Sequence, residues 1–357
     1  MSTSPGDWRA IVGRIDRGAA LAIDQDIARR EISPCEIVEG FRQLTALRRG
    51  LEPDYGVRGV ATAYAFLYLV QRAASIAALL SSELIPRKPV RILDLGAGCG
   101  ALALALDALG LRDCEVVAVE PSAEMRAFPL MKPGARLTVL KGTREDIADR
   151  SLDLPGTFDV ILLSACFPYG WPGSGSRVVQ TDFALALRPW LKPGGLVLGI
   201  EPAAKHAVAD AVAEGLRLGD YSVRAWALDL EQAFPRLAAA ATSKLLEERS
   251  PAIRKCRAFD YLVDDLIGPP WLIETAAKQP DVVYAAIPVG LASGQRRTPQ
   301  PSRAETQAAA TTAHAAKRPD ARWRRRIRSL AESQIALGAA LLAATAFAAW
   351  LALTLIP

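Results

Sequence analysis

A short apolar segment that runs directly into a glycine-rich turn most constrains the fold of this chain. Residues 90–95 are Val-Arg-Ile-Leu-Asp-Leu, and Gly96-Ala97-Gly98-Cys99-Gly100 and a helical stretch at 101–108 follow at once. Because glycine has no Cβ, such a turn lets the backbone approach a ligand closely. A strand, a tight turn and a helix in succession predict an open α/β sheet with a ligand at the carboxyl end of this strand.

Further apolar runs alternate with helical stretches along the following part of the chain. Strands are expected at 115–119, 136–140, 158–163 and 196–200. Strands that alternate with helices indicate a parallel sheet covered on both faces. The second strand ends at Glu120, and an acid in that position can accept hydrogen bonds from both hydroxyls of a ribose. Gly96, Gly98 and Glu120 therefore predict a nucleoside site.

The glycine turn alone is a weak signal, because two classes of nucleoside-binding protein fit it. Gly96-x-Gly98-x-x-Ala101 also matches the dinucleotide fingerprint, and Glu120 lies 20 residues beyond Gly100. In that class an acid at this distance holds the ribose. On the turn alone, an NAD-binding domain is an alternative.

Three segments together resemble class I S-adenosylmethionine-dependent methyltransferases. The run 94–100, Asp-Leu-Gly-Ala-Gly-Cys-Gly, matches the family's acidic-x-Gly-x-Gly-x-Gly motif in all four specified positions. The run 158–163 looks like the family's fourth strand, and 187–198, with its Lys-Pro-Gly-Gly turn, resembles the segment leading into the fifth. The resemblance covers roughly residues 88–202. It favours a methyltransferase over an NAD-binding domain, in which that turn is not expected here.

The resemblance implies an α/β fold, a seven-stranded Rossmann-like methyltransferase sheet with helices on both faces, in a domain over 86–291. Its sixth and seventh strands are expected at 221–230 and 281–289, with the seventh inserted antiparallel beside the fifth. The implied cofactor is S-adenosylmethionine. The cofactor-binding residues carried over from the matching motifs are Asp94, Gly96, Gly98, Gly100, Glu120, Pro121, Ser122, Thr143, Arg144 and Ser164.

The resemblance also gives these residues expected roles. The backbone of the three glycines would pass the methionine part of the cofactor, and Asp94 would bind near its amino group, directly or through water. Glu120 would hold the ribose, with Pro121 and Ser122 beside the adenine. Ser164, after the fourth strand, would lie where substrate and cofactor meet.

The adenine contact stays open, because the chain departs from the family pattern there. Thr143 occupies the place where the family often has an acid that meets the adenine amino group. The contact is therefore expected from Glu145, from Asp146 or from backbone. The alternative for these two acids is solvation in the first turn of a helix, where they suit its dipole.

The acceptor side shows no identifiable catalytic base. The fourth strand continues as Ser-Ala-Cys-Phe-Pro-Tyr-Gly-Trp at 164–171, which departs from the Asp/Asn-Pro-Pro-Tyr/Phe pattern of enzymes that methylate amines of nucleic-acid bases. Phe167, Tyr169 and Trp171 are expected either to form an aromatic floor for a flat or greasy acceptor or to anchor the loop. Cys166 is expected to be buried and inert.

Two segments add to this domain. Residues 1–85 are expected to form a helical N-terminal extension or lid, with helices at 8–28 and 60–85 and a capping box at Ser33 and Glu36. The insertion 231–280 is expected to be largely helical. A connection of that length is more often a lid or substrate element than a plain connection.

The C-terminal part is expected to attach the chain to a membrane. Residues 292–320 form a flexible linker, and 321–334 a basic juxtamembrane segment. The 22 residues 335–356 carry no charge, and as a helix they would span ~33 Å, which matches a bilayer core of ~30 Å. Positive charge on the cytoplasmic side then predicts a single-pass tail anchor with the body in the cytoplasm. A core helix or an amphipathic surface helix is the alternative.

Charge and cysteine content exclude other classes. Residues 1–290 carry 33 basic and 35 acidic residues, so the body lacks the cationic surplus that nucleic-acid binding needs. The five cysteines are widely spaced, which predicts no disulfide framework and a reducing compartment. The two histidines have no zinc spacing, so no metal site is expected, and His206 is expected on a helix surface rather than as a base.

These observations predict a membrane-anchored methyltransferase for a small, lipophilic or aromatic acceptor, with nucleic acid unlikely as a partner. Two alternatives remain. The stretch 55–64 faintly resembles the ribosomal small-subunit methyltransferase family linked to mitochondrial ribosome assembly, which suggests action on ribosomal RNA. The other alternative is a non-catalytic scaffold that binds S-adenosylmethionine.

Overall fold

The structure is a computed structural model that describes residues 5–49, 51–81, 90–149, 151–167, 177–202, 205–228, 240–256 and 281–289. All of them belong to one compact unit, Met1–Gln295. The linker, the basic segment and the membrane anchor expected at 292–356 lie outside the described residues, as do Tyr169 and Trp171.

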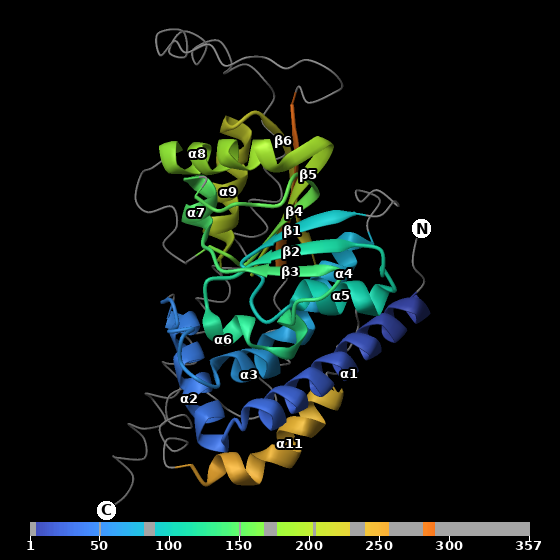
Figure 1. The fold of residues 1–357 in the computed structure, drawn as a ribbon, viewed down its shortest axis with the longest axis vertical. Coiled ribbons are helices and arrows are strands. Elements are labelled where there is room, and N and C mark those ends of the chain that lie inside the picture. Colours follow the sequence, from blue (N-terminus) through green and yellow to red (C-terminus); the bar gives the residue numbers. More distant parts are fainter. Residues whose placement is uncertain are drawn as a thin grey trace, which may run out of the picture. The chain divides into compact units, whose positions relative to one another are not determined.

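Seven strands form one mixed sheet, which confirms the predicted strand count (Figure 1). The strands are β1 (Arg91–Leu95), β2 (Glu115–Val119), β3 (Leu137–Leu140), β4 (Phe158–Ser164), β5 (Leu191–Glu201), β6 (Tyr221–Leu228) and β7 (Asp281–Pro288). Their order is β3-β2-β1-β4-β5-β7-β6. β1 to β5 are parallel, whereas β7 is antiparallel to both β5 and β6, as the resemblance implied. β5 begins earlier than the apolar pattern predicted, because the Lys-Pro-Gly-Gly turn is part of it.

The strand order reverses at β1, which pairs with β2 on one side and with β4 on the other. Leu95, at the end of β1, is in register with Val119 of β2 and with Leu163 of β4. The loops that leave these three strands therefore diverge from one point of the sheet edge. In open α/β sheets such a switch point is where ligands bind.

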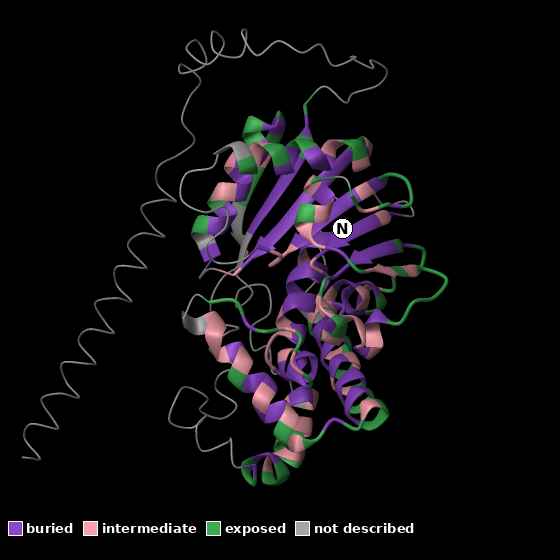
Figure 2. Cartoon of the chain, turned by 60° about the vertical axis from the view of Figure 1, so that its left-hand side comes forward, coloured by how far each residue is buried: buried purple, intermediate pink, exposed green. Residues whose placement is uncertain are grey.

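Helices cover both faces, and successive side chains of each strand alternate between them. Ile92 belongs to one buried cluster and Leu93 to the other. The first cluster joins the sheet to α1 (Pro5–Arg30), α2 (Pro34–Leu44), α3 (Val60–Tyr64), α4 (Val70–Leu80) and α5 (Ala101–Leu109). The second joins it to α7 (Arg144–Ala148), α8 (Arg177–Leu187) and α9 (His206–Leu218). Figure 2 shows the strands buried between these layers.

The N-terminal helices agree with their sequence signals. Ser33 caps α2, and its side chain and that of Glu36 make the reciprocal bonds of the predicted capping box. α3, a π-helical turn at Ala65–Leu69 and α4 follow one another without a break. This 21-residue run, Val60–Leu80, is long and apolar enough to cross a membrane by length and composition, but 72% of its apolar window is buried inside the protein. It is therefore a core helix of the fold.

The described part of the insertion is α11 (Ala240–Arg254), which lies along α1 (Figure 1). Asp16 of α1 caps the start of α11: its carboxylate accepts the backbone N–H of Ala241 at 2.6 Å and of Thr242 at 3.1 Å. No residue of α11 lines the cavity described below. Residues 240–256 therefore brace the N-terminal helices, and the rest of the insertion 231–280, for which a lid or substrate role is expected, lies outside the described residues.

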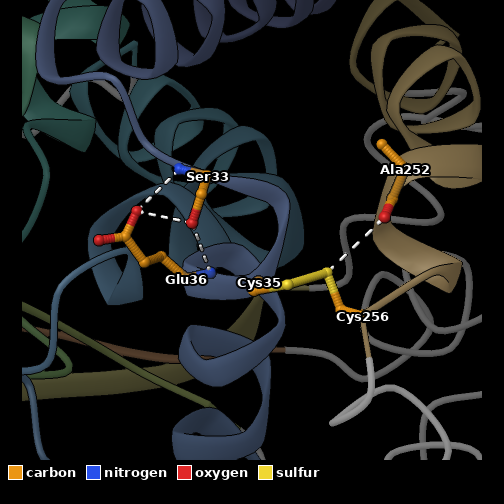
Figure 3. Close-up of a disulfide and its surroundings, with 5 residues drawn as sticks. All are labelled: Ser33, Cys35, Glu36, Ala252 and Cys256. Carbon is orange, nitrogen blue, oxygen red and sulfur yellow. Dashed lines mark hydrogen bonds between the residues drawn. A yellow bond between two sulfur atoms is a disulfide. The ribbon is translucent and has the colours of Figure 1, made fainter.

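A disulfide fastens the other end of α11, which corrects the expectation that no cysteines pair. Cys256, just after α11, is bonded to Cys35 in the first turn of α2, with their Cα atoms 5.4 Å apart (Figure 3). The other three cysteines are free thiols. The pair is 221 residues apart in sequence, and no local spacing pattern indicates so distant a bond.

Candidate functional site

A cavity of about 330 Å³ lies at the carboxyl ends of β1, β2 and β4, at the predicted switch point. Its walls come from the turn after β1, the loop after β2, the loop after β3 and the end of β4. Of the predicted cofactor-binding residues, those that line it are Gly96, Gly98, Glu120, Pro121, Thr143, Arg144 and Ser164. Asp94, Gly100 and Ser122 are not among the residues that line it.

The glycines of the turn serve two different purposes. Gly96, Gly98 and Gly100 all have positive φ, at 71°, 56° and 92°, a conformation that L side chains rarely adopt. A Cβ on Gly96 would overlap the Cβ of Cys166, so this glycine is required for packing. A Cβ on Gly98 would meet no atom within 4 Å. Gly98 therefore leaves space within the cavity itself, as a backbone that approaches a ligand must.

Glu120 is held over this turn by its own hydrogen bonds. One carboxylate oxygen accepts the backbone N–H of Gly98 and the other that of Ser122, both at 2.8 Å. Burial raises the pKa of Glu120, and these two bonds oppose the rise. Each oxygen keeps a further lone pair, so the carboxylate can still accept two hydroxyls of a ligand.

Asp94 is buried beneath the turn, at the end of β1. It is 3% exposed, and its Oδ1 has no hydrogen-bond partner within the protein. Burial, with the neighbouring charge of Glu120 as a second cause, raises the pKa of Asp94 to about 7. A buried carboxyl with an unused oxygen is suited to a cationic or hydrogen-bond-donating group brought by a ligand.

The loop after β3 places its two acids differently. Thr143 caps α7, and Asp146 accepts the Thr143 backbone N–H at 2.7 Å and its hydroxyl at 2.9 Å. These bonds hold the pKa of Asp146 below its usual value. Glu145 lines the cavity instead and pairs with Arg144 at 2.6 Å. Asp146 thus has the helix-capping role, and Glu145 remains the candidate for an adenine contact.

The end of β4 brings Ser164 and Cys166 to the cavity. Cys166 is half-buried, and not fully buried as predicted. Burial against the protein raises its pKa well above its ordinary value, so its thiol stays protonated and unreactive near neutral pH. Phe167 is 1% exposed and packs edge-on against Phe183, with ring centroids 5.4 Å apart. Phe167 therefore has the loop-anchoring role, one of the two expected for it, and the other two aromatic residues of the expected floor lie outside the described residues.

The N-terminal extension supplies a wall that the motifs did not indicate. Glu52, Tyr55 and Tyr64 line the cavity. The Ser122 hydroxyl donates to the backbone carbonyl of Tyr55 at 2.6 Å while it caps α6 (Ala123–Arg126). No periodicity or spacing in residues 51–64 indicated this contact, because it depends on how the extension packs against the loop after β2.

The charged residues of the lining favour a cationic ligand. Glu52, Glu120 and Glu145 contribute carboxylates, whereas Arg144 alone among the lining residues contributes a cation. The Arg144 guanidinium also donates to the backbone carbonyl of Cys166 at 3.3 Å. An anionic group placed in this cavity would meet a surplus of negative charge at short range.

No protein-family model matches this chain, and no curated protein does. Solved structures do match. One is a SAM-dependent methyltransferase from Thiobacillus denitrificans in complex with S-adenosyl-L-homocysteine, at 17% identity over 61% of this chain and 91% of that chain, with a TM-score of 0.39. Another is phosphoethanolamine N-methyltransferase 2 from Haemonchus contortus in complex with S-adenosyl-L-methionine, at 16% identity over 64% and 57%, with a TM-score of 0.41.

The matching structures also include the [4+2]-cyclase SpnF, at 18% identity over 62% of this chain and 83% of that chain, with a TM-score of 0.37. Identities and TM-scores this low do not define a reaction.

Proposed function

We propose that this chain is an S-adenosylmethionine-dependent methyltransferase. One observation carries the proposal. The Glu120 carboxylate is fixed by the Gly98 N–H beside an open glycine turn, at the point where the strand order reverses. This is the arrangement that holds a ribose and the group attached to it.

Charge supports a sulfonium nucleoside over a dinucleotide. A dinucleotide brings an anionic pyrophosphate, and the lining carries three carboxylates against one guanidinium. The sulfonium and ammonium groups of S-adenosylmethionine are cations, which the same lining attracts. The unpartnered Oδ1 of Asp94, buried beneath the turn, adds a further acceptor on that side.

The residues present fit this cofactor, which supplies an activated methyl group when bound. Glu120 would accept the ribose hydroxyls, while Pro121 and Glu145 would flank the adenine. Ser164 and the protonated Cys166 would border the methyl group on the acceptor side. The contribution of the chain is then orientation and the exclusion of water, which can supply a large part of the rate enhancement.

The acceptor proposed is small and lipophilic or aromatic. The support is the uncharged run 335–356, which would tether the enzyme where such molecules partition and so raise their effective concentration. The slightly acidic body over 1–290 suits a nucleic acid poorly. Membrane attachment, with the body on the cytoplasmic side, is part of the same proposal.

Calorimetry on the full chain tests the cofactor. We expect S-adenosylhomocysteine to bind and Glu120→Gln to weaken it about 10- to 100-fold, as for loss of a charge-assisted hydrogen bond. Glu115→Gln is the matched control, because Glu115 starts β2, the strand that Glu120 follows, and it pairs with Arg91 at 3.1 Å, away from the cavity. Saturation by a nicotinamide dinucleotide without binding of S-adenosylhomocysteine would overturn the proposal.

Transfer of a tritiated methyl group to cell extracts tests the acceptor. Label in the lipid-soluble fraction is the expected result. Label in ribosomal RNA would replace the proposed acceptor with the nucleic-acid alternative. Cofactor binding without label in any fraction would indicate a scaffold protein.

A further inference from the structure

A tyrosine and a buried arginine of the N-terminal extension lie together beside the glycine turn. Tyr64 lines the cavity, and its phenol lies close enough to Cys99, within the turn, to interact with it electrostatically. The guanidinium of Arg72 is hydrogen-bonded to the Tyr64 hydroxyl, and Arg72 is 7% exposed. The pair therefore places a positive charge behind a cavity wall that otherwise carries mainly carboxylates.

The backbone between Tyr64 and Arg72 brings the two residues to the same face of the helical run. Tyr64 and Arg72 flank the π-helical turn Ala65–Leu69, a feature that is rare and frequent at functional sites. A π turn adds one residue, so a separation of eight positions here corresponds to about seven in a regular helix, or about two full turns. Tyr68, between them, packs its ring against Tyr64 with centroids 5.1 Å apart.

The proposed cofactor needs a cation at this end. Its amino-acid end carries a carboxylate as well as an ammonium group, and the glycine turn is expected to pass that end. Arg144, the cation of the lining, is already engaged by Glu145 and by the carbonyl of Cys166. Asp94 can serve the ammonium group but would repel the carboxylate.

We propose that the Tyr64 hydroxyl and the Arg72 guanidinium form the subsite for the carboxylate of the cofactor's amino-acid end. This inference rests on the proposed function and deepens it. A guanidinium is always charged, and the attraction between its charge and a carboxylate is stronger away from bulk water. Tyr64 is the part of the pair that reaches the cavity wall.

Two nucleosides that differ in the amino-acid end test the subsite. S-adenosylhomocysteine has the carboxylate, and 5′-methylthioadenosine lacks the whole amino-acid group. Arg72→Met keeps the apolar stem, and we expect it to weaken S-adenosylhomocysteine about 10- to 100-fold in calorimetry while the affinity for 5′-methylthioadenosine stays within about twofold. Tyr64→Phe should show a smaller loss with the same selectivity. Tyr68→Phe is the matched control and should leave both affinities unchanged.

The outcomes separate the subsite from the proposed function. Equal losses for both nucleosides in Arg72→Met, or no loss for either, would overturn the subsite. Binding of neither nucleoside by the unaltered chain would instead remove the proposed function. If Arg72→Met does not fold, the subsite is tested instead by measuring the binding of the methyl ester of S-adenosylhomocysteine to the unaltered chain. The unaltered chain should bind the ester more weakly than the acid, and equal affinities would refute the subsite.

Discussion

Breaking the Cys35–Cys256 bond is expected to destabilise the chain substantially. The bond closes a ring across a separation of 221 residues, and the chain-entropy relation gives about 5 kcal/mol for a ring of this size. Loss of a native disulfide typically costs about 2–5 kcal/mol, because native-state strain and structure in the unfolded chain reduce the ideal value. We therefore expect reduction to lower the free energy of unfolding by about 2–5 kcal/mol.

The polar contacts of α11 are each weaker than the bond. At the start of α11 the Asp16 cap is worth about 0.5–2 kcal/mol. Near its end, Arg249 pairs with Asp24 at 2.6 Å, but both side chains are about half exposed, and exposed pairs contribute about 0–1 kcal/mol. Reduction should therefore loosen α11 first at its C-terminal end.

Denaturant unfolding of the full chain, with and without a thiol reductant, measures the effect. The Cys35→Ser, Cys256→Ser double variant is the control: it should match the reduced protein and be insensitive to reductant. Thiol titration of the unfolded, unreduced chain should find three free thiols of the five cysteines. Five free thiols, or equal unfolding free energies with and without reductant, would refute the reasoning.

Two further predictions concern the glycine turn and the acid beneath it. Gly98→Ala should weaken the binding of S-adenosylhomocysteine in calorimetry, and the positive φ of Gly98 predicts a modest loss of stability as well. Gly96→Ala should lower the melting temperature further, because its Cβ would also overlap Cys166; equal losses of stability in the two variants would contradict the division of roles. The pKa of Asp94 rises from 3.8 to about 7 on folding, so the folded state holds this proton more tightly, and stability without ligand should fall as the pH rises from about 4 to about 7. When denaturant unfolding is measured across that pH range, the free energy of unfolding should fall less steeply with pH in Asp94→Asn than in the unaltered chain. An equal slope in the two proteins would assign the effect to other groups.

The sheet could be predicted from the sequence because its signals are local. Apolar runs of four to eight residues bounded by turns indicate buried strands, and β2 begins and ends at the predicted residues. The start of β5 was missed because Lys-Pro-Gly-Gly breaks the apolar pattern. Glu120 and the glycines of the turn were predictable, since their spacing along the chain already reflects how a nucleoside is held.

Features that depend on distant contacts left no such signal. The partner of Cys35 lies at the far end of α11, and the order of the cysteines does not specify their pairing. The same holds for the acids after β3. The role of Asp146 differs from that of Glu145 because Thr143 donates two hydrogen bonds to Asp146, and the sequence does not show which acid accepts them. Phe167 likewise could be assigned to the core only once Phe183 was placed against it.

The N-terminal extension is therefore part of the site and not an appendage to it. Tyr55 is fastened to the loop after β2 by the Ser122 hydroxyl, and the Gly59 N–H donates to Glu124 of α6 at 3.3 Å. Glu120, the residue proposed to hold the ribose, immediately precedes this loop. The loop after β2 therefore supports both Glu120 and the cavity wall that the extension forms. A ligand that orders the loop must then also stabilise residues 51–64. The motifs over 88–202 specify the class of cofactor, whereas the enclosure of the cavity depends on a segment outside them.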